Sequence, residues 1–408
     1  MTSEPAEAYV WIWLPRAVDP VVAGLLEVNG PVIEFTYGSS YLARADRISL
    51  WPDELPLVRG RQRPPRGMTA AGVITDAGPD AWGRRVVEAR QAPGGPTRLG
   101  LLTYLLESGS DRIGALDFQA DPRLYRARWS QASLDDLVNA AQRLEAGEPL
   151  STPLNEVLLH GSSIGGARPK VLLDDGDRKM VAKLSSSTDT YPVVKSEAVA
   201  MELARRVGLD VAPVEVARAL GKDVLLVDRF DRGPAGARRF VVSASTILGV
   251  DRAGSAFASY PALADAIRKR FTDVRATLAE LFGRIVLNVC VSNTDDHARN
   301  HAAFWDGQQL TLTPAYDVCP QLRPAGPAHQ AMAIARSGYR IARLAGCVEA
   351  AADYLLSRSE AADIVDHQVR TIEAHWDDAA DAARLTRGER AQLRERQIIL
   401  NPDIFQPA

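Results

Sequence analysis

Polar side chains gather at 293–301, where the sequence reads NTDDHARNH directly after a long apolar stretch. Asp295 and Asn300 are five positions apart. In catalytic loops of the HRDxxxxN type, the Asp accepts the proton of a substrate hydroxyl and the Asn five positions later holds Mg²⁺. The spacing therefore favours a phosphoryl-transfer loop. The structural alternative is a loop whose Asp and Asn side chains only cap backbone groups.

A zinc site is a second alternative for this segment, because His297 and His301 are four residues apart. The pair lacks the Glu of the HExxH motif and does not lie in a helical pattern. Magnesium is therefore favoured over zinc.

A glycine-rich turn, SIGGARPK at 163–170, lies between two apolar runs. Glycines let backbone N–H groups approach phosphate oxygens, because no Cβ stands in the way. The same residues also suit an ordinary hairpin turn, and the GxGxxG motif is absent.

Three charged residues complete the pattern. Lys183 stands among apolar neighbours on a predicted strand, so it either extends to solvent or points towards an anion. Glu197 is a candidate partner for Lys183, although the helix dipole also favours an acidic residue early in a helix. Asp317 follows a predicted hairpin, where kinases place an Mg²⁺-binding Asp, but no Phe-Gly follows it. The order of all these features is that of a protein-kinase-like core and indicates a phosphotransferase.

The elements that must position these residues divide the chain into three predicted parts. A β-rich front subdomain covers 1–150, a small sheet lobe with the glycine-rich loop covers 151–230, and a helical lobe with the catalytic loop covers 231–408. The predicted fold class is α+β, with a bilobal protein-kinase-like core behind a β-rich N-terminal subdomain. Strands are predicted at 9–14, 32–37, 171–173, 180–184, 214–219, 224–227, 302–305 and 310–312, with a weaker one at 55–58. Helices are predicted at 99–106, 134–144, 196–207, 263–271, 274–291 and within 348–400.

The composition sets limits on the protein class. The chain has 408 residues, of which 46% are hydrophobic and 24% charged, and its formal net charge is −3. A dedicated nucleic-acid binder usually has a basic excess, which this chain lacks. Three cysteines without a CxxC pair fit a reduced cytosolic protein. The sequence has no signal-peptide pattern and no apolar run long enough to cross a membrane, so we expect a cytoplasmic protein.

The chain resembles the HipA family of serine/threonine kinases, the toxins of type II toxin–antitoxin modules. The resemblance lies in the motifs SIGGARPK (163–170), VAKL (181–184), LVDRFDR (226–232), NTDDHARN (293–300) and PAYDV (314–318). In the front segment it lies in GPDAWGRR (78–85) and SDRIGALDF (110–118).

The resemblance implies a role for each matching residue. Asp295 would be the catalytic base, and Asn300 and Asp317 would hold Mg²⁺. Glu197 would form a structural ion pair with Lys183. The residues implied to bind ATP are Ser163, Gly165, Gly166, Ala167, Lys170, Lys183, Asp228, Phe230 and His297, with 227–230 as the hinge that meets adenine.

Ser163 also matches the loop serine that family members autophosphorylate. A phosphate there adds about −1.5 to −2 charges and would repel the ATP phosphates, which makes Ser163 a candidate self-inactivation switch.

This sequence departs from the family pattern at three places. Ser162 precedes Ser163, so either serine could be modified. Arg168-Pro169 replaces a polar pair, and Pro169 stiffens the loop. Asp296 follows the expected base where a small residue is usual, and it would either lend charge to a metal or face solvent.

The family also implies partners. A small HipB-like helix-turn-helix antitoxin would bind the toxin and carry the contact with operator DNA. The substrate would be a protein serine or threonine, which in known members often belongs to an aminoacyl-tRNA synthetase. Two alternatives stay open: a small-molecule kinase of the aminoglycoside or choline type, and a catalytically dead kinase fold that acts as a co-repressor.

Overall fold

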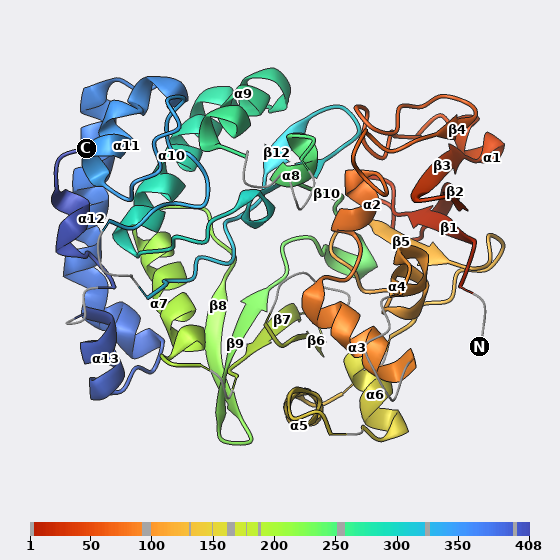
Figure 1. Ribbon diagram of the computed structural model, residues 1–408, viewed down its shortest axis with the longest axis horizontal. Helices are drawn as coiled ribbons and strands as arrows, with labels where there is room; N and C mark the ends of the chain where they lie inside the picture. The colour runs from red at the N-terminus through yellow and green to blue at the C-terminus, as the bar shows by residue number, and fades with distance from the viewer. Residues whose placement is uncertain are drawn as a thin grey trace.

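The computed structural model describes residues 4–91, 99–129, 132–148, 150–160, 168–176, 178–186, 189–250, 258–322, 327–394 and 398–408. Its described elements form three antiparallel sheets and a large group of helices (Figure 1). The two termini lie at opposite ends of the long axis (Figure 1).

The first sheet belongs to the front of the chain and has the strand order β4-β3-β2-β1-β5. Its strands are β1 (Glu7–Ile12), β2 (Val21–Asn29), β3 (Val32–Tyr37), β4 (Arg61–Gln62) and β5 (Leu116–Gln119). Short helices accompany it: α1 (Ser39–Leu42), α2 (Gly72–Asp76), α3 (Ala81–Gln91) and α4 (Leu101–Glu107). β2 can lie this close to β3 because Gly24 has no side chain. A Cβ at this position would clash with the Thr36 carbonyl oxygen and lie 2.6 Å from the Phe35 ring.

The second sheet has the order β6-β7-β9-β8. It contains β6 (Lys170–Asp175), β7 (Arg178–Leu184), β8 (Val214–Ala219) and β9 (Lys222–Asp228). Helix α7 (Val193–Arg206) joins β7 to β8 and packs against β8 and β9. Buried residues of α3, α5 (Leu134–Glu145) and α6 (Thr152–His160) share one hydrophobic cluster with this sheet. This packing crosses residue 150, and the predicted boundaries at 150 and 230 stay predictions.

The third sheet, β10-β11-β12, lies between the first sheet and the helical lobe (Figure 1). It comprises β10 (Val241–Ser243), β11 (Ala302–Trp305) and β12 (Leu310–Leu312), and α8 (Ala244–Ile247) follows β10. The helical lobe contains α9 (Tyr260–Arg270), α10 (Val274–Cys290), α11 (Leu344–Glu349), α12 (Arg358–Ala382) and α13 (Arg387–Arg394). α10 is buried along most of its length, so the loop that follows it starts from a rigid base.

The mixed α+β architecture is therefore confirmed. For 55–58, which Pro56 reduces to an edge strand or a loop, the structure shows a loop, in which Leu55 forms an isolated bridge with Trp51. Pro56, which has no N–H to donate, cannot extend that pairing. In the described part of the chain, none of the helices combines the length and the apolar character needed to span a bilayer.

A buried ionic cluster joins the front of the chain to the end of the second sheet. Asp231 is 1% exposed and accepts hydrogen bonds from the Gly114 N–H (2.7 Å), from Arg229 Nη2 (2.9 Å) and from Arg232 Nη1 (2.7 Å). The same two arginines also pair with Asp111, at 3.0 and 2.6 Å. Burial opposes ionisation of Asp231, yet the two guanidinium groups lower its pKa. We call Asp111, Gly114, Arg229, Asp231 and Arg232 the interlock.

Candidate active site

Lys183 lies at the centre of an ionic cluster built from three separate elements. Its Nζ is 2.5 Å from Glu197 Oε1 and 2.5 Å from Asp317 Oδ1. Lys183 comes from β7 and Glu197 from the first turns of α7, while Asp317 follows β12 by five residues. The sequence-based pairing of Lys183 with Glu197 is thus present in the structure, and Asp317 joins it from 134 residues away.

Lys170, which the family resemblance also assigns to ATP binding, lies directly opposite Lys183 in the sheet. Lys170 on β6 and Lys183 on β7 are register partners, so their side chains leave the same face of the sheet. Lys170 is 4% exposed, and burial lowers its pKa while Asp80 and Asp317 act to raise it. Two lysines side by side repel each other, and the acidic groups around them offset that repulsion. The two ammonium groups are thus held on one face of the sheet among carboxylates.

The protonation states follow from burial and neighbours. Burial acts to lower the pKa of Lys183, but Asp317 and Glu197 raise it above its ordinary value, so the lysine is charged. Burial opposes ionisation of Asp317, yet Lys183 and Lys170 lower its pKa. For Glu197, burial prevails and raises the pKa. Asp317 is therefore the carboxylate of this cluster that stays ionised most readily.

The loop predicted to carry the catalytic base begins where α10 ends. Ser292 has a φ of +56°, a left-handed conformation that is unusual for a residue with a side chain. This residue turns the chain out of the helix, and Asp295 then lies exposed on the loop. The Asn300 side chain donates from Nδ2 to the Asp295 carbonyl oxygen at 3.5 Å, so the two residues of the predicted motif contact each other.

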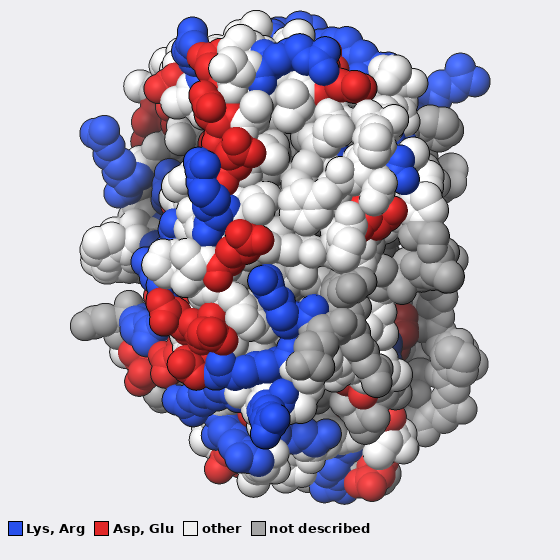
Figure 2. Space-filling model, turned by 90° about the vertical axis from the view of Figure 1, so that its left-hand side faces the viewer, with Lys and Arg blue, Asp and Glu red and all other residues white. Residues whose placement is uncertain are grey.

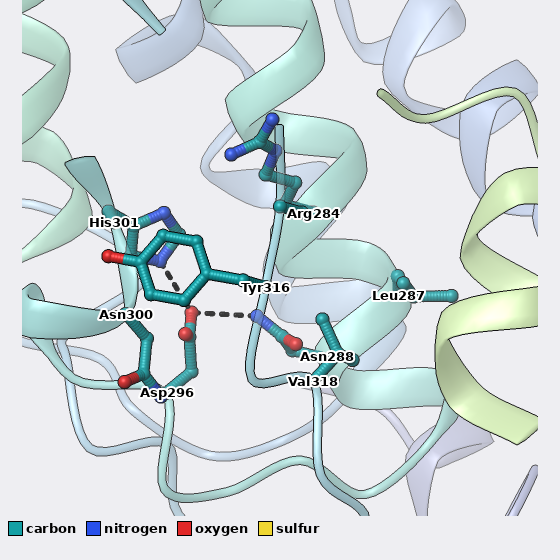
Figure 3. Close-up of a pocket in the computed structure, with 9 residues that line it drawn as sticks. Arg284, Leu287, Asn288, Asp296, Asn300, His301, Tyr316 and Val318 are labelled. Atoms are coloured by element: carbon teal, nitrogen blue, oxygen red, sulfur yellow. Dashed lines mark hydrogen bonds and ion pairs between the residues drawn. The ribbon is translucent and has the colours of Figure 1, made fainter. Parts of the chain in front are cut away.

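Asp296, unlike its exposed neighbour Asp295, is buried and hydrogen-bonded. It is 3% exposed, and its Oδ2 accepts hydrogen bonds from Tyr260 Oη (2.5 Å), Asn288 Nδ2 (2.7 Å) and His301 Nε2 (2.7 Å). Burial opposes its ionisation, but His301 and the hydrogen bonds lower its pKa. Figure 3 shows Asn288 and His301 pointing at the Asp296 carboxylate. The expectation that Asp296 faces solvent is therefore wrong, since it anchors the loop from inside.

A small cavity lies beside this anchor, and Figure 3 shows its walls. Its lining includes Asn288, Asp296, Asn300, His301 and Tyr316. Tyr316 also donates from its hydroxyl to the Arg299 carbonyl oxygen at 2.7 Å, which ties the segment before Asp317 to the residue before Asn300. The loop and the Asp317 segment are thus held together.

The residues expected to bind Mg²⁺ fit that ion. Asp317 offers an ionised carboxylate, and among the described residues Asn300 Oδ1 accepts no hydrogen bond. Both are hard oxygen donors, and Mg²⁺ typically takes only one or two protein ligands and completes its shell with phosphates and water. Asp317 has a φ of +60°, a strained conformation of the kind that collects at functional sites.

The two histidines of the zinc alternative have different surroundings. His301 is bound to Asp296, while His297 Nε2 is 3.3 Å from Arg299 Nη2. The described residues contain no group of three or more His, Cys, Asp or Glu side chains placed to hold a metal ion. His297 lies close enough to Asp317 to help lower its pKa.

The predicted hinge residues lie at the end of β9. Asp228 accepts a hydrogen bond from Arg178 Nη2 at 2.7 Å, and its role in nucleotide binding stays a prediction. Phe230 is half-buried between the rings of Phe304 and Tyr316, with centroids at 5.8 and 5.6 Å. The other charged residues of LVDRFDR, Arg229, Asp231 and Arg232, belong to the interlock. Most polar groups of this motif therefore connect the second sheet to the front of the chain.

Five residues of the glycine-rich loop, Ser162, Ser163, Gly165, Gly166 and Ala167, lie outside the described residues. The residues that sequence reasoning missed are Tyr260 and Asn288, which hold Asp296. A signal for Asn288 was available, because it is a polar residue within the apolar run of α10. Tyr260 gave no comparable signal.

Comparisons with known proteins identify the family and the fold. The model of the HipA-like C-terminal domain matches residues 162–376, more than half of the chain. "Putative kinase Y4mE" of Sinorhizobium fredii is 28% identical over 174 residues, which are 38% of this chain and 41% of that protein. The chain thus spans about two fifths of the length of this curated relative.

Among solved structures, the chain resembles the HipA of Shewanella oneidensis MR-1 in a complex with HipB and its operator DNA. The TM-score is 0.68 at 17% identity, and the match covers 92% of this chain and 94% of that one. The proinflammatory kinase CtkA of Helicobacter pylori gives a TM-score of 0.38 at 14% identity, over 56% of this chain and 93% of that one, too low to indicate a shared fold. The predicted α+β, kinase-like fold behind a β-rich front subdomain is confirmed, and the chain belongs to the HipA family through its HipA-like C-terminal domain.

Proposed function

We propose that this protein is an ATP- and Mg²⁺-dependent serine/threonine protein kinase and the toxin of a HipA/HipB-like module. The observation that carries the proposal is the ionic cluster in which Lys183 contacts both Glu197 and Asp317 at 2.5 Å. The kinase core needs a strand lysine paired with a helix glutamate, a distant aspartate that binds Mg²⁺, and a loop with the DxxxxN spacing. That combination suits the transfer of a phosphoryl group.

The proposed roles follow from the positions of these groups. Lys183 and Lys170 would bind the phosphates of ATP, and Glu197 would keep the Lys183 side chain aimed at them. Asp317 and Asn300 would hold Mg²⁺, which neutralises phosphate charge when bound. Asp295 is exposed on its loop, where a substrate hydroxyl can reach it, and it would accept the hydroxyl proton. Asp296 would fix the loop that presents Asp295.

Several finer proposals rest on the family resemblance. The protein would autophosphorylate on Ser163 or Ser162 in its glycine-rich loop. Its substrate would be a protein linked to translation, such as an aminoacyl-tRNA synthetase, and it would act in the cytoplasm. Mass spectrometry of the purified protein after incubation with ATP tests the first point, and a phosphate found only at other positions would remove the switch.

We also propose a HipB-like helix-turn-helix antitoxin as the partner. The support is the fold shared with a HipA whose solved structure contains HipB and operator DNA. The net charge of −3 favours DNA contact through that partner. On the face that carries α12 and α13, acidic and basic side chains are interspersed, an arrangement that does not by itself suit a DNA backbone (Figure 2).

The central test compares Asp295→Asn with the unaltered protein. Loss of a general base typically lowers the rate about 10²-fold to 10⁴-fold. We expect the variant to lose transfer of labelled phosphate from ATP to protein in a cell extract while its unfolding transition is unchanged. Full activity in the variant refutes the assignment of the base. Label on a small metabolite with none on protein would favour a small-molecule kinase, and ATP binding without turnover would favour a co-repressor.

A further inference from the structure

The start of α7, which carries Glu197, also carries the buried lysine Lys195, and this lysine holds the helix in place. Lys195 is 7% exposed, and its Nζ lies 3.2 Å from Asp223 Oδ2 on β9. The same Nζ lies 3.1 Å from each carboxylate oxygen of Glu389 on α13. A buried ammonium group is stable only with such partners, so Lys195 fixes α7 to the sheet and to α13 at once.

α13 is itself fixed at its start and along its side. Glu389 Oε2 accepts the Thr386 N–H at 2.7 Å, and the Glu389 N–H donates to Thr386 Oγ1 at 3.3 Å, which is a capping box. Arg390 pairs with Asp377 (3.4 Å) and Asp381 on α12. Glu389 therefore serves two functions with one carboxylate: it caps α13 and holds Lys195.

The chain beyond α13 contacts the other half of the candidate site. Ser292, the left-handed residue at the start of the catalytic loop, donates from Oγ to the Ile398 carbonyl oxygen at 2.5 Å. The Leu400 N–H donates to the carbonyl oxygen of Cys290, the last residue of α10, at 2.8 Å. The same stretch of chain thus touches the helix of Glu197 and the root of the loop that carries Asp295.

We propose that residues 386–394 and 398–400 form a C-terminal brace that sets the position of α7, and with it Glu197, relative to the catalytic loop. Lys195 and Glu389 are its positioning residues. The inference rests on the proposed function for its effect on activity, but the position of α7 can be measured without any activity.

Glu389→Gln is the variant that isolates the ionic contact. Gln also forms capping boxes, so the start of α13 keeps its hydrogen bonds while the charge opposite Lys195 is lost. The matched control is Glu360→Gln, because Glu360 forms the equivalent capping box with Ser357 at the start of α12, and its one ion pair among the described residues is with the exposed Arg275. Both variants remove one carboxylate from a helix N-terminus, but Glu389 pairs with a residue of α7, whereas Glu360 pairs with Arg275 of α10.

The first measurement is amide hydrogen exchange in the intact protein. We expect the amides of α7 to exchange about tenfold faster in Glu389→Gln than in the unaltered protein, and to be unchanged in Glu360→Gln. Equal exchange of α7 in the two variants overturns the brace.

The second measurement is a double-mutant cycle on phosphate transfer from ATP. We expect Glu389→Gln to lower kcat/KM about tenfold alone, and to have no further effect in a Glu197→Gln background, because it acts through Glu197. Additive losses show that α13 acts by another route and overturn the positioning role. If the unaltered protein transfers no phosphate, the proposed function fails, and the exchange comparison still decides whether the brace holds α7.

Discussion

Two adjacent carboxylates in the loop after α10 should respond to substitution in opposite ways. Asp295 is exposed, whereas Asp296 is buried with three donors aimed at one of its oxygens. We predict that Asp296→Ala destabilises the protein strongly. Asp295→Ala, at the exposed neighbour, should leave stability close to that of the unaltered protein.

The size of the effect follows from the donors that would lose their acceptor. Tyr260 Oη, Asn288 Nδ2 and His301 Nε2 would each stay buried without their acceptor, at a cost of about 1–3 kcal/mol per group. Partial relaxation and entry of water into the adjacent cavity reduce that sum. Breaking a buried, hydrogen-bonded charge pair typically costs about 3–5 kcal/mol, and we expect Asp296→Ala to fall in that range. Asp296→Asn keeps an acceptor in place and should cost about 1–2 kcal/mol.

The assay is guanidinium unfolding of the three variants beside the unaltered protein at neutral pH, together with phosphate transfer from ATP. Both Asp296 variants should lose stability, and Asp296→Ala should also lose activity because its loop is no longer anchored. An unfolding free energy for Asp296→Ala within about 0.5 kcal/mol of the unaltered value would refute the anchoring role, because surface substitutions have effects of that size. Loss of stability in Asp295→Ala would contradict its exposed position.

Two further predictions concern the contacts of the front subdomain. Asp231→Asn should destabilise the protein by about 3 kcal/mol in guanidinium unfolding, because Arg229 and Arg232 of the interlock lose one of the two carboxylates that balance their charge. The control Asp46→Asn, at an exposed pair with Arg44, should have no measurable effect. Equal stability of these two variants would show that the interlock contributes little. Burial raises the pKa of Glu54 to about 7, so its protonated form favours the folded state, and stability should fall as the pH rises from about 4 to 7 and then level off. Glu54→Gln should remove that part of the pH profile, about 3 kcal/mol. An unchanged stability difference between the two proteins across this pH range would contradict the assigned pKa.

Local patterns predicted the four strands of the second sheet and two strands of the third, but not β10. The strands expected at 214–219, 302–305 and 310–312 match β8, β11 and β12 at both ends, and the helix expected at 274–291 matches α10 within one residue. These segments have a clear apolar period and lie between turn residues, so their sequence alone is informative. β2 was not predicted, because Gly24 interrupts its strand pattern, and the close approach of Thr36 and Phe35 that requires a glycine there is visible only in the structure.

The part of the candidate site that could be predicted is the part in which the order of the residues along the chain indicates their roles. Lys183, Glu197 and Asp317 were each ambiguous alone, and their order indicated one site that the structure brings together. The surroundings of Asp296 were not predictable, since its partners come from α9, from α10 and from the residue before β11. The same holds for Lys195, whose partners are 28 and 194 residues away; only the folded chain shows that it is buried.

The interlock has a consequence for recombination between relatives. Its acidic and glycine members at 111 and 114 lie in the front subdomain, while Arg229, Asp231 and Arg232 lie beyond the second sheet. A crossover point placed near residue 150 would separate the two halves of this buried charge cluster. Chimeras made at that point should fold poorly unless residues 229–232 are taken from the same parent as the front subdomain. Residues 111–114 and 229–232 should therefore be exchanged together.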